Sequence, residues 1–306
     1  MTPLRQALAD YLALRRALGY KLARDEKLLI QFIKHLEALG TSRVTTEQCL
    51  AWSCLANGGD NWRHHRLSVT RKFATYLRTV DPATEVPPSD LLPARPRRAT
   101  PYLYSEVEIR GLIDAAGSLR TRLRVATYQT LLGLLAVTGM RVGEAIRLDR
   151  DDVNLETGVI TIRCTKFGKT RELPLHSTTV EAVRAYLRQT AGHQSPPSTP
   201  AVFVSTPGTR LRYCVVHRTF QRLVRRAGLA PRSGTCRPRI HDLRHTFAVQ
   251  TLLDAYRNGW DVQERLALLS TYLGHVNPAG TYWYLSASPE LLGLAADRLA
   301  NRRGVR

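Results

Sequence analysis

Apolar residues recur every three or four positions through the first 80 residues, which predicts a helical N-terminal domain. Thr2-Pro3 is a typical start for the first helix, and Gly19 and Gly40 are typical ends for the first and second. Thr45-Thr46-Glu47-Gln48 has the capping-box pattern and begins a third helix. A fourth begins near Asn61. The apolar positions of these helices include Leu4, Leu8, Leu12, Leu28, Phe32, Leu36, Leu50, Trp52, Leu67 and Phe73.

A proline-rich segment then interrupts the helical pattern. It predicts a stiff, extended linker over residues 81–101. Its prolines are Pro82, Pro87, Pro88, Pro93, Pro96 and Pro101. We therefore predict a helical domain over residues 1–80, the linker, and a second domain over residues 102–306.

The second domain begins with another capping box, Ser105-Glu106-Val107-Glu108, and a long helix is expected from there to about Val137. Alternating β-branched residues predict a strand over 158–164. A turn at 166–169 and a return strand over 170–175 complete a hairpin, after which helices dominate. The expected fold class is mainly α with a small antiparallel β-sheet.

Charge favours a nucleic-acid partner. The net charge is +20, and both predicted domains are basic, which suits a protein that surrounds a polyanion. An arginine-rich solvated surface is the simpler alternative, and a basic stripe on an amphipathic helix is often only its solvent face. The basic residues that we predict to contact DNA are Arg63, Arg66, Arg71, Lys72, Arg97, Arg98 and Lys169.

The sequence also argues against a membrane protein and against a disulfide framework. The longest apolar run, residues 131–137, is far too short to cross a bilayer, so no membrane partner is expected. Five cysteines without CxxC spacing indicate reduced thiols in a cytoplasm. We expect a cytoplasmic protein associated with the nucleoid.

Two dispersed arginines are candidates for gripping a phosphate. Arg141 follows Thr138-Gly139-Met140 and precedes a short predicted helix, and Arg244 lies within His241-Asp242-Leu243-Arg244-His245. Two guanidinium groups can bind the non-bridging oxygens of one phosphate and stabilise its pentacoordinate transition state. The structural alternative for Arg141 is an ion pair with Glu144 or Asp149.

The histidines near Arg244 admit two interpretations. Residues 241, 244 and 245 share one helix face, where His241 can manage protons and His245 can be a structural residue. The same stretch also has the spacing of a zinc-binding H-E-x-x-H helix. A permanent cation, Arg244, on the ligand face argues against zinc, so we expect neither a metal nor a cofactor.

A late tyrosine is the candidate nucleophile. Tyr284 follows His275 in a segment that also contains a competing hydroxyl, Tyr282. Because the pKa of tyrosine is normally about 10, the nucleophile must lose its proton during attack or sit among cations. A hairpin lysine can supply a proton to the leaving oxygen. The residues alone do not choose between Lys166 and Lys169.

Together these motifs resemble the tyrosine recombinases, also called the phage integrase family. The resemblance implies a helical SAM-like core-binding domain and an α+β catalytic domain. It assigns the family's catalytic positions to Arg141, Lys166, His241, Arg244, His275 and Tyr284, with Glu144 as an acidic residue behind the first arginine.

The resemblance also implies a reaction and partners. The tyrosine attacks a DNA phosphate, forms a 3′-phosphotyrosyl link and needs neither metal nor ATP. The expected partner is double-stranded DNA with specific recombination sites. The protein is expected to be a monomer in free solution and a homotetramer on two sites, with accessory or partner recombinases as further candidates. In that tetramer, a C-terminal segment such as residues 289–303 is exchanged between protomers; packing on its own domain is the alternative.

The nucleophile region departs from many relatives in reading Gly-Thr-Tyr-Trp-Tyr-Leu, which favours a mobile-element branch that acts in integration, excision or transposition. Two alternatives remain. One is a type IB topoisomerase-like enzyme that relaxes DNA. The other is a catalytically silent DNA-binding regulator with the same fold.

Overall fold

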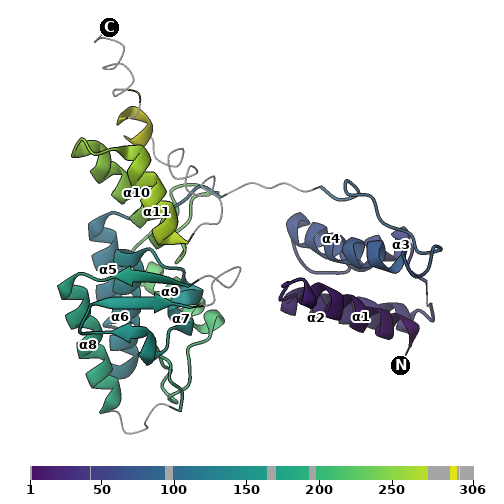
Figure 1. The fold of residues 1–306 in the computed structure, drawn as a ribbon, viewed down its shortest axis with the longest axis horizontal. Helices are drawn as coiled ribbons and strands as arrows, with labels where there is room; N and C mark the ends of the chain where they lie inside the picture. The colour runs from purple at the N-terminus through teal and green to yellow at the C-terminus, as the bar shows by residue number, and fades with distance from the viewer. Residues whose placement is uncertain are drawn as a thin grey trace. The chain divides into compact units, whose positions relative to one another are not determined.

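The computed structural model describes residues 2–41, 43–93, 99–163, 170–192, 198–274, 290–294 and 296. The chain divides into two compact units, Met1–Arg98 and Ala99–Arg306 (Figure 1). None of the described helices combines the length and the apolar content that a membrane crossing requires.

Four helices form the described part of the N-terminal unit: α1 (Pro3–Ala17), α2 (Ala23–Ala38), α3 (Thr46–Cys54) and α4 (Asp60–Leu77). Their predicted starts are confirmed at Thr2, which precedes Pro3, and at Thr45, which makes the full capping box with Gln48. The core centres on Phe32 and Phe73, which are fully buried.

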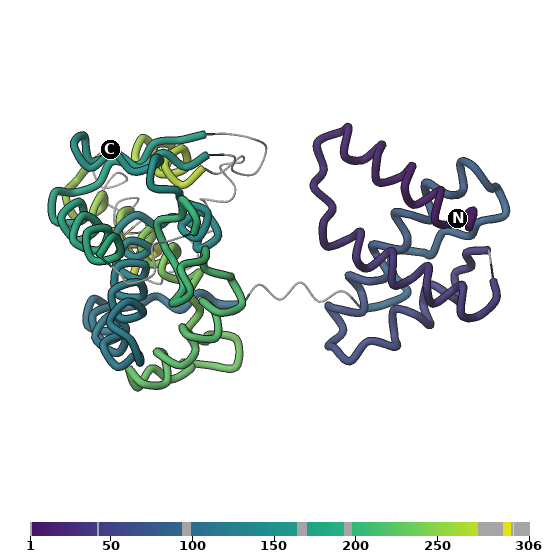
Figure 2. Tube along the Cα trace, turned by 90° about the horizontal axis from the view of Figure 1, so that it is seen from below, coloured from purple at the N-terminus to yellow at the C-terminus, as the bar shows by residue number. Residues whose placement is uncertain are grey.

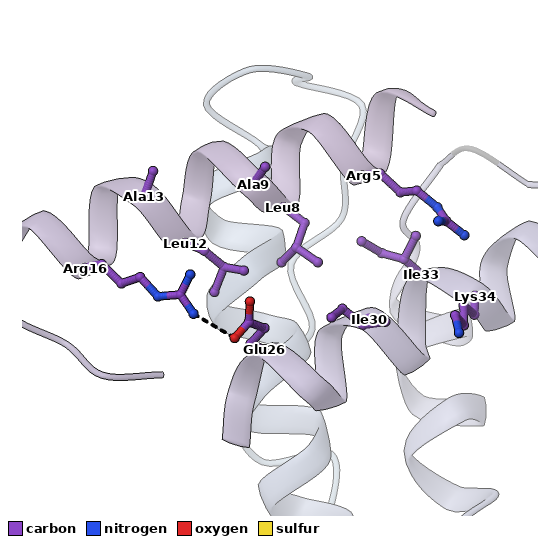
Figure 3. A pocket seen from close by; sticks show the side chains of 10 residues that line it. All are labelled: Arg5, Leu8, Ala9, Leu12, Ala13, Arg16, Glu26, Ile30, Ile33 and Lys34. Carbon is purple, nitrogen blue, oxygen red and sulfur yellow. Dashed lines mark hydrogen bonds and ion pairs between the residues drawn. The ribbon is translucent and has the colours of Figure 1, made fainter. Parts of the chain in front are cut away.

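A groove of about 420 Å³ lies between α1 and α2 (Figure 3). Leu8, Leu12 and Ile33 form part of its apolar lining. At its rim, Arg16 and Glu26 form an ion pair with a 2.7 Å separation. The groove therefore follows the contact between α1 and α2.

The second unit combines α-helices and a small sheet. The helices are α5 (Glu106–Ala116), α6 (Arg122–Thr138), α7 (Val142–Arg147), α8 (Ser177–Ala191), α9 (Tyr213–Arg226), α10 (Asp242–Arg257) and α11 (Val262–Leu273). A 3₁₀ turn, η1 (Arg150–Asp152), leads into β1 (Val153–Asn154), β2 (Val159–Ile162) and β3 (Arg171–Pro174). Figure 2 traces the path of the chain through these elements.

The sheet is antiparallel with the order β1-β2-β3. Ile160 pairs with Leu173 and both are fully buried, so one face of the sheet joins the core that α6 and α8 also build. The predicted strands over 158–164 and 170–175 are confirmed by β2 and β3. β1 was not predicted, since two residues are too few for an alternation pattern.

The single long helix expected from Glu106 to about Val137 is wrong. The chain forms two helices, because α5 ends at Ala116 and Thr121 starts α6 by accepting a hydrogen bond from the Arg124 amide at 3.3 Å. Between them Leu119 is buried, so the break brings an apolar side chain into the core. The two helices pack against each other and not end to end.

A second, smaller core joins α10 and α11. It contains Leu252, Leu266 and Leu273 and also takes in Leu291, which is 1% exposed. Glu290 forms an ion pair with Arg257 at 2.6 Å. The described part of the C-terminal segment therefore packs on its own unit.

Candidate active site

Arg141 lies at a sharp reversal between α6 and α7. Gly139 ends α6 with a left-handed φ of 58°. A Cβ there would lie 2.4 Å from Cδ1 of Phe247 on α10, so a side chain is excluded both by the backbone and by the neighbour. Arg141 follows as the N-cap of α7, with its side chain 35% exposed. The packing of Gly139 against α10 thus sets the position of the turn that carries Arg141.

Glu144 is buried directly behind Arg141. Its carboxylate accepts hydrogen bonds from Nη1 of Arg141 at 2.8 Å and from the Arg141 backbone amide at 2.9 Å. It also accepts one from Nη2 of Arg171 at 2.8 Å. Burial alone would raise the pKa of Glu144, but these donors and the positive charge of Arg171 lower it to about 2. The expected pairing of Arg141 with Glu144 is present and orients the arginine.

We expect Glu144→Gln to lower the free energy of unfolding at neutral pH by up to ~3 kcal/mol. The pKa of Glu144 falls from about 4.3 in an unfolded chain to about 2 in the folded one. The carboxylate therefore contributes stability above about pH 4.3 and loses it as the pH falls through about 2. Urea unfolding across this range measures the effect. A gap between wild type and variant that stays constant with pH would contradict it.

The H-x-x-R pair lies at the start of α10. His241 is the N-cap residue, and its ring meets that of His245 edge to face, with centroids 5.0 Å apart. Asp242, fully buried, accepts two hydrogen bonds from Arg239 at 2.8 and 2.9 Å. The contacts of Asp242 fix the first turn of the helix, and the ring contact agrees with the shared face predicted for residues 241 and 245.

His241 is suited to accept a proton. The pKa of His241 is lowered to about 4, although the residue is exposed to solvent. The largest cause is desolvation by the packed neighbours, and the positive charges of His245, Arg244 and Arg141 lower the pKa further. The imidazole is therefore neutral at neutral pH. Among the described residues, no three His, Cys, Asp or Glu side chains converge in a way that could hold a metal ion.

Arg244 ties together three parts of the chain. It is 2% exposed, and its Nη1 donates to the Gly139 carbonyl at 2.9 Å while Nη2 donates to the Leu273 carbonyl at 2.7 Å. Gly139 lies two residues before Arg141, and Leu273 lies two before His275. The start of α10 thus meets the segments that lead into two other candidate catalytic positions.

Arg171 was missed by the sequence analysis. It begins β3 and contacts both Glu144 and the end of α11, where its Nε donates to the Tyr272 carbonyl at 2.9 Å. A signal was available, because alternation places Arg171 on the same face of the strand as the fully buried Leu173.

Several predicted residues lie outside the described part of the chain. They are Lys166, Lys169, His275, Tyr284, its competitor Tyr282, Arg97 and Arg98. Lys166 and Lys169 belong to the segment that joins β2 to β3, and His275 directly follows Gly274 at the end of α11. Their roles stay predictions.

The basic residues predicted on α4 differ in their surroundings. The guanidinium of Arg66 lies over the Trp52 ring, 3.6 Å from its centroid, and donates to the Trp52 carbonyl at 2.7 Å. Burial lowers its pKa. Arg66 thus packs α4 on α3. Arg63 lies 3.9 Å from Asp60, and Arg71 donates to the Pro88 carbonyl at 3.5 Å. Lys72 is exposed.

Helix α9 carries a basic face that the sequence analysis also missed. Its inner side buries Val216, Phe220 and Leu223. Four arginines lie on the outer side with the i, i+4, i+7, i+8 spacing of one helix face: Arg218, Arg222, Arg225 and Arg226. All four are exposed, and within the described ranges no acidic side chain pairs with them.

Comparisons with known proteins point to one family. The sequence profile described as "Phage integrase family" matches residues 104–290. The protein y4rB of Sinorhizobium fredii, named as an integrase/recombinase, is 44% identical over 310 residues, covering 99% of this chain and 98% of that protein. Tyrosine recombinase XerC of Azotobacter vinelandii is 32% identical over 232 residues, 76% of this chain and 71% of that one.

The same likeness extends to solved structures. The Tn1549 transposon integrase in complex with transposon right end DNA superposes with a TM-score of 0.64 at 17% identity, covering 98% of this chain and 100% of that chain. At this identity the likeness concerns the fold. It confirms the predicted class, a mainly helical architecture with a small antiparallel sheet.

Proposed function

The chain belongs to the phage integrase family of tyrosine recombinases, and on this premise we propose that it cuts and rejoins DNA at specific sites through Tyr284. These matches confirm the resemblance inferred from the motifs. The family consists of DNA strand-transferring enzymes. The assignment of individual residues is our proposal. The observation that carries it is the bridge from Arg244 to the Gly139 and Leu273 carbonyls.

In the proposed reaction, one phosphoester bond forms as another breaks, and two side chains take up and supply the protons. The Tyr284 oxygen bonds to phosphorus as its proton passes to the neutral His241, and the bond from phosphorus to the 5′ oxygen breaks. Lys166 gives that oxygen a proton. Arg141 and Arg244 hold the non-bridging oxygens and stabilise the added charge of the transition state.

The second half of the reaction reverses the first. A 5′-hydroxyl from a partner strand attacks the phosphorus of the 3′-phosphotyrosyl link and passes its proton to Lys166. The bond from phosphorus to the tyrosine oxygen breaks, His241 returns its proton to that oxygen, and the strands are exchanged. The phosphoester energy is kept throughout, so the residues need no nucleotide cofactor. His275, which directly follows Gly274, would add a hydrogen bond to the phosphate.

The arginine geometry suits this reaction. Two of the five N–H groups of the Arg244 guanidinium go to backbone carbonyls, which fixes its plane before any DNA arrives. Arg141 is held from behind by Glu144. Such fixed donors stabilise developing charge without reorganising during the reaction.

Covalent trapping tests the proposal. Purified protein first selects its binding sequence from random duplex DNA, and a duplex with that sequence and a nick beside the scissile phosphate is then the substrate. We expect a protein–DNA band that survives detergent and disappears with protease. Binding without such a band would identify the silent regulator. Relaxation of a plasmid that lacks the selected sequence would identify the topoisomerase-like alternative.

We propose that the protein is a monomer in free solution and a tetramer on two DNA sites, in the cytoplasm and associated with the nucleoid. We also propose a mobile-element role in integration, excision or transposition, since y4rB is named as an integrase/recombinase and the segment Gly-Thr-Tyr-Trp-Tyr-Leu departs from many relatives. Light scattering with and without DNA carrying two sites tests the assembly. A further partner recombinase would be indicated if strand exchange required cell extract although cleavage did not.

DNA binding is proposed to use α9 in addition to Arg63, Arg71, Lys72, Arg97, Arg98 and Lys169. We expect Arg218→Ala/Arg222→Ala to weaken binding to all sequences and to reduce the slope of log affinity against log salt by about 2. Filter binding across a salt series measures this slope. Arg188→Ala, an exposed arginine on α8, is the matched control and should leave the slope unchanged. An unaltered slope in the double variant would remove α9 from the interface.

A further inference from the structure

We infer that Arg171 is a positioning residue, which fixes Arg141 and the end of α11 relative to each other. The inference rests on the proposed function, since it concerns the orientation of the groups that would hold the phosphate. Arg171 itself is placed behind the site, with its side chain only 11% exposed.

One side of the Arg171 guanidinium faces α7. Nη2 donates to Oε2 of Glu144 at 2.8 Å and Nη1 approaches Oε1 at 3.3 Å. The same Oε1 accepts from Nη1 of Arg141 at 2.8 Å. A buried carboxylate therefore lies between two guanidinium groups, and its position depends on both. Because Arg171 has a forked contact, it fixes the direction of the carboxylate as well as its charge.

The other side of the guanidinium faces the end of α11. Nε donates to the Tyr272 carbonyl at 2.9 Å. Gly274 ends this helix with a left-handed φ of 66°, and a Cβ on it would lie 2.9 Å from Nη1 of Arg171. The arginine thus packs directly against the backbone from which His275 continues. Arg171 thus joins Glu144 to the end of α11 through one side chain.

This arrangement predicts a defect in catalysis and not in DNA binding. A lysine can neutralise Glu144 but offers one ammonium group in place of a fork, so it cannot keep both contacts in the same plane. A misplacement of reacting groups by about 1 Å costs on the order of 10²-fold in rate. We expect Arg171→Lys to lower the single-turnover rate of covalent adduct formation by ~10–100-fold, with an unchanged dissociation constant for DNA.

Arg210→Lys is the matched control. Arg210 also joins a carboxylate, that of Asp149, to a backbone carbonyl, that of Ile146 at 3.0 Å, but at the far end of α7. The probe is the nicked duplex that carries the selected sequence. We expect Arg210→Lys to cleave at the wild-type rate. A folded Arg171→Lys protein that cleaves as fast as Arg210→Lys would overturn the inference.

A pair of glycine variants tests the same contact without changing the arginine. Gly274→Ala would push on Arg171, whereas Gly259→Ala has a similar φ of 70° after a helix but no atom within 4 Å of the new Cβ. The backbone strain is therefore matched, and only the contact differs. We expect Gly274→Ala alone to slow cleavage. Equal rates in the two variants would count against the positioning role.

Hydrogen exchange in the free protein separates this inference from the proposed function. We expect Arg171→Lys, and not Arg210→Lys, to speed exchange of the amides at the end of α11 and of those in the first turn of α7, around Glu144. Wild-type protein that forms no adduct would contradict the proposed function. Exchange in both segments that is the same in Arg171→Lys as in the wild type would contradict the inference, whatever the activity.

Discussion

Replacing Tyr284 with phenylalanine is expected to abolish the covalent protein–DNA adduct, a loss of at least ~10⁴-fold in cleavage. The phenyl ring lacks the oxygen that we propose to bond to phosphorus, so the variant has no nucleophile at this position. DNA affinity should stay close to the wild-type value, because the ring is retained. A gel of the nicked duplex after detergent treatment measures the adduct.

Tyr282→Phe is the control for this prediction. Residue 282 lies two positions away on the chain, so its hydroxyl is expected to point elsewhere on a helix. The variant should form the adduct at nearly the wild-type rate. If Tyr282→Phe were the variant that loses the adduct, the nucleophile would be Tyr282 and the assignment above would be wrong.

Replacing Arg244 with lysine is expected to lower the cleavage rate by about 10²–10³-fold. An ammonium group cannot reproduce a guanidinium whose plane is set by two carbonyls, so the charge that we propose to bind the phosphate would move. The change also leaves the buried carbonyls of Gly139 and Leu273 short of donors, which costs about 1–3 kcal/mol for each unsatisfied group. Single-turnover cleavage and urea unfolding measure the two effects separately.

Arg257→Lys provides the comparison on the same helix. Arg257 lies in the last turn of α10, where it is half-exposed and pairs with Glu290 at 2.6 Å. Exposed pairs contribute ~0–1 kcal/mol, so little change in stability or in cleavage is expected. A wild-type cleavage rate in a folded Arg244→Lys protein would contradict the role given to Arg244.

Local signals in the sequence predicted local structure well. The capping boxes at Thr45 and Ser105 are both present, because they depend on residues three positions apart. The β-hairpin follows from alternation within each strand. The expected helix from Glu106 to about Val137 is wrong since the break at residues 117–121 is set by packing, which buries Leu119 between the two helices.

The site could be predicted only in part. Its motif residues are recognisable one by one, and Glu144 lies three residues from the arginine that it orients. Arg171 could not be placed this way, because its partners lie 27 and 101 residues away in the chain. Such distant contacts come from tertiary packing. The basic face of α9 differs from Arg171, because the i, i+4, i+7, i+8 spacing of its arginines is visible in the sequence itself.

The close approach of Phe247 to Gly139 bears on any attempt to retarget the enzyme by directed evolution. Randomised libraries that include position 139 would mostly encode proteins in which the turn before Arg141 cannot close, since even alanine collides with the aromatic ring. Positions of the exposed arginines of α9 are better choices for randomisation. Active clones recovered from an unbiased library should still encode glycine at 139, and sequencing the survivors would reveal whether they do.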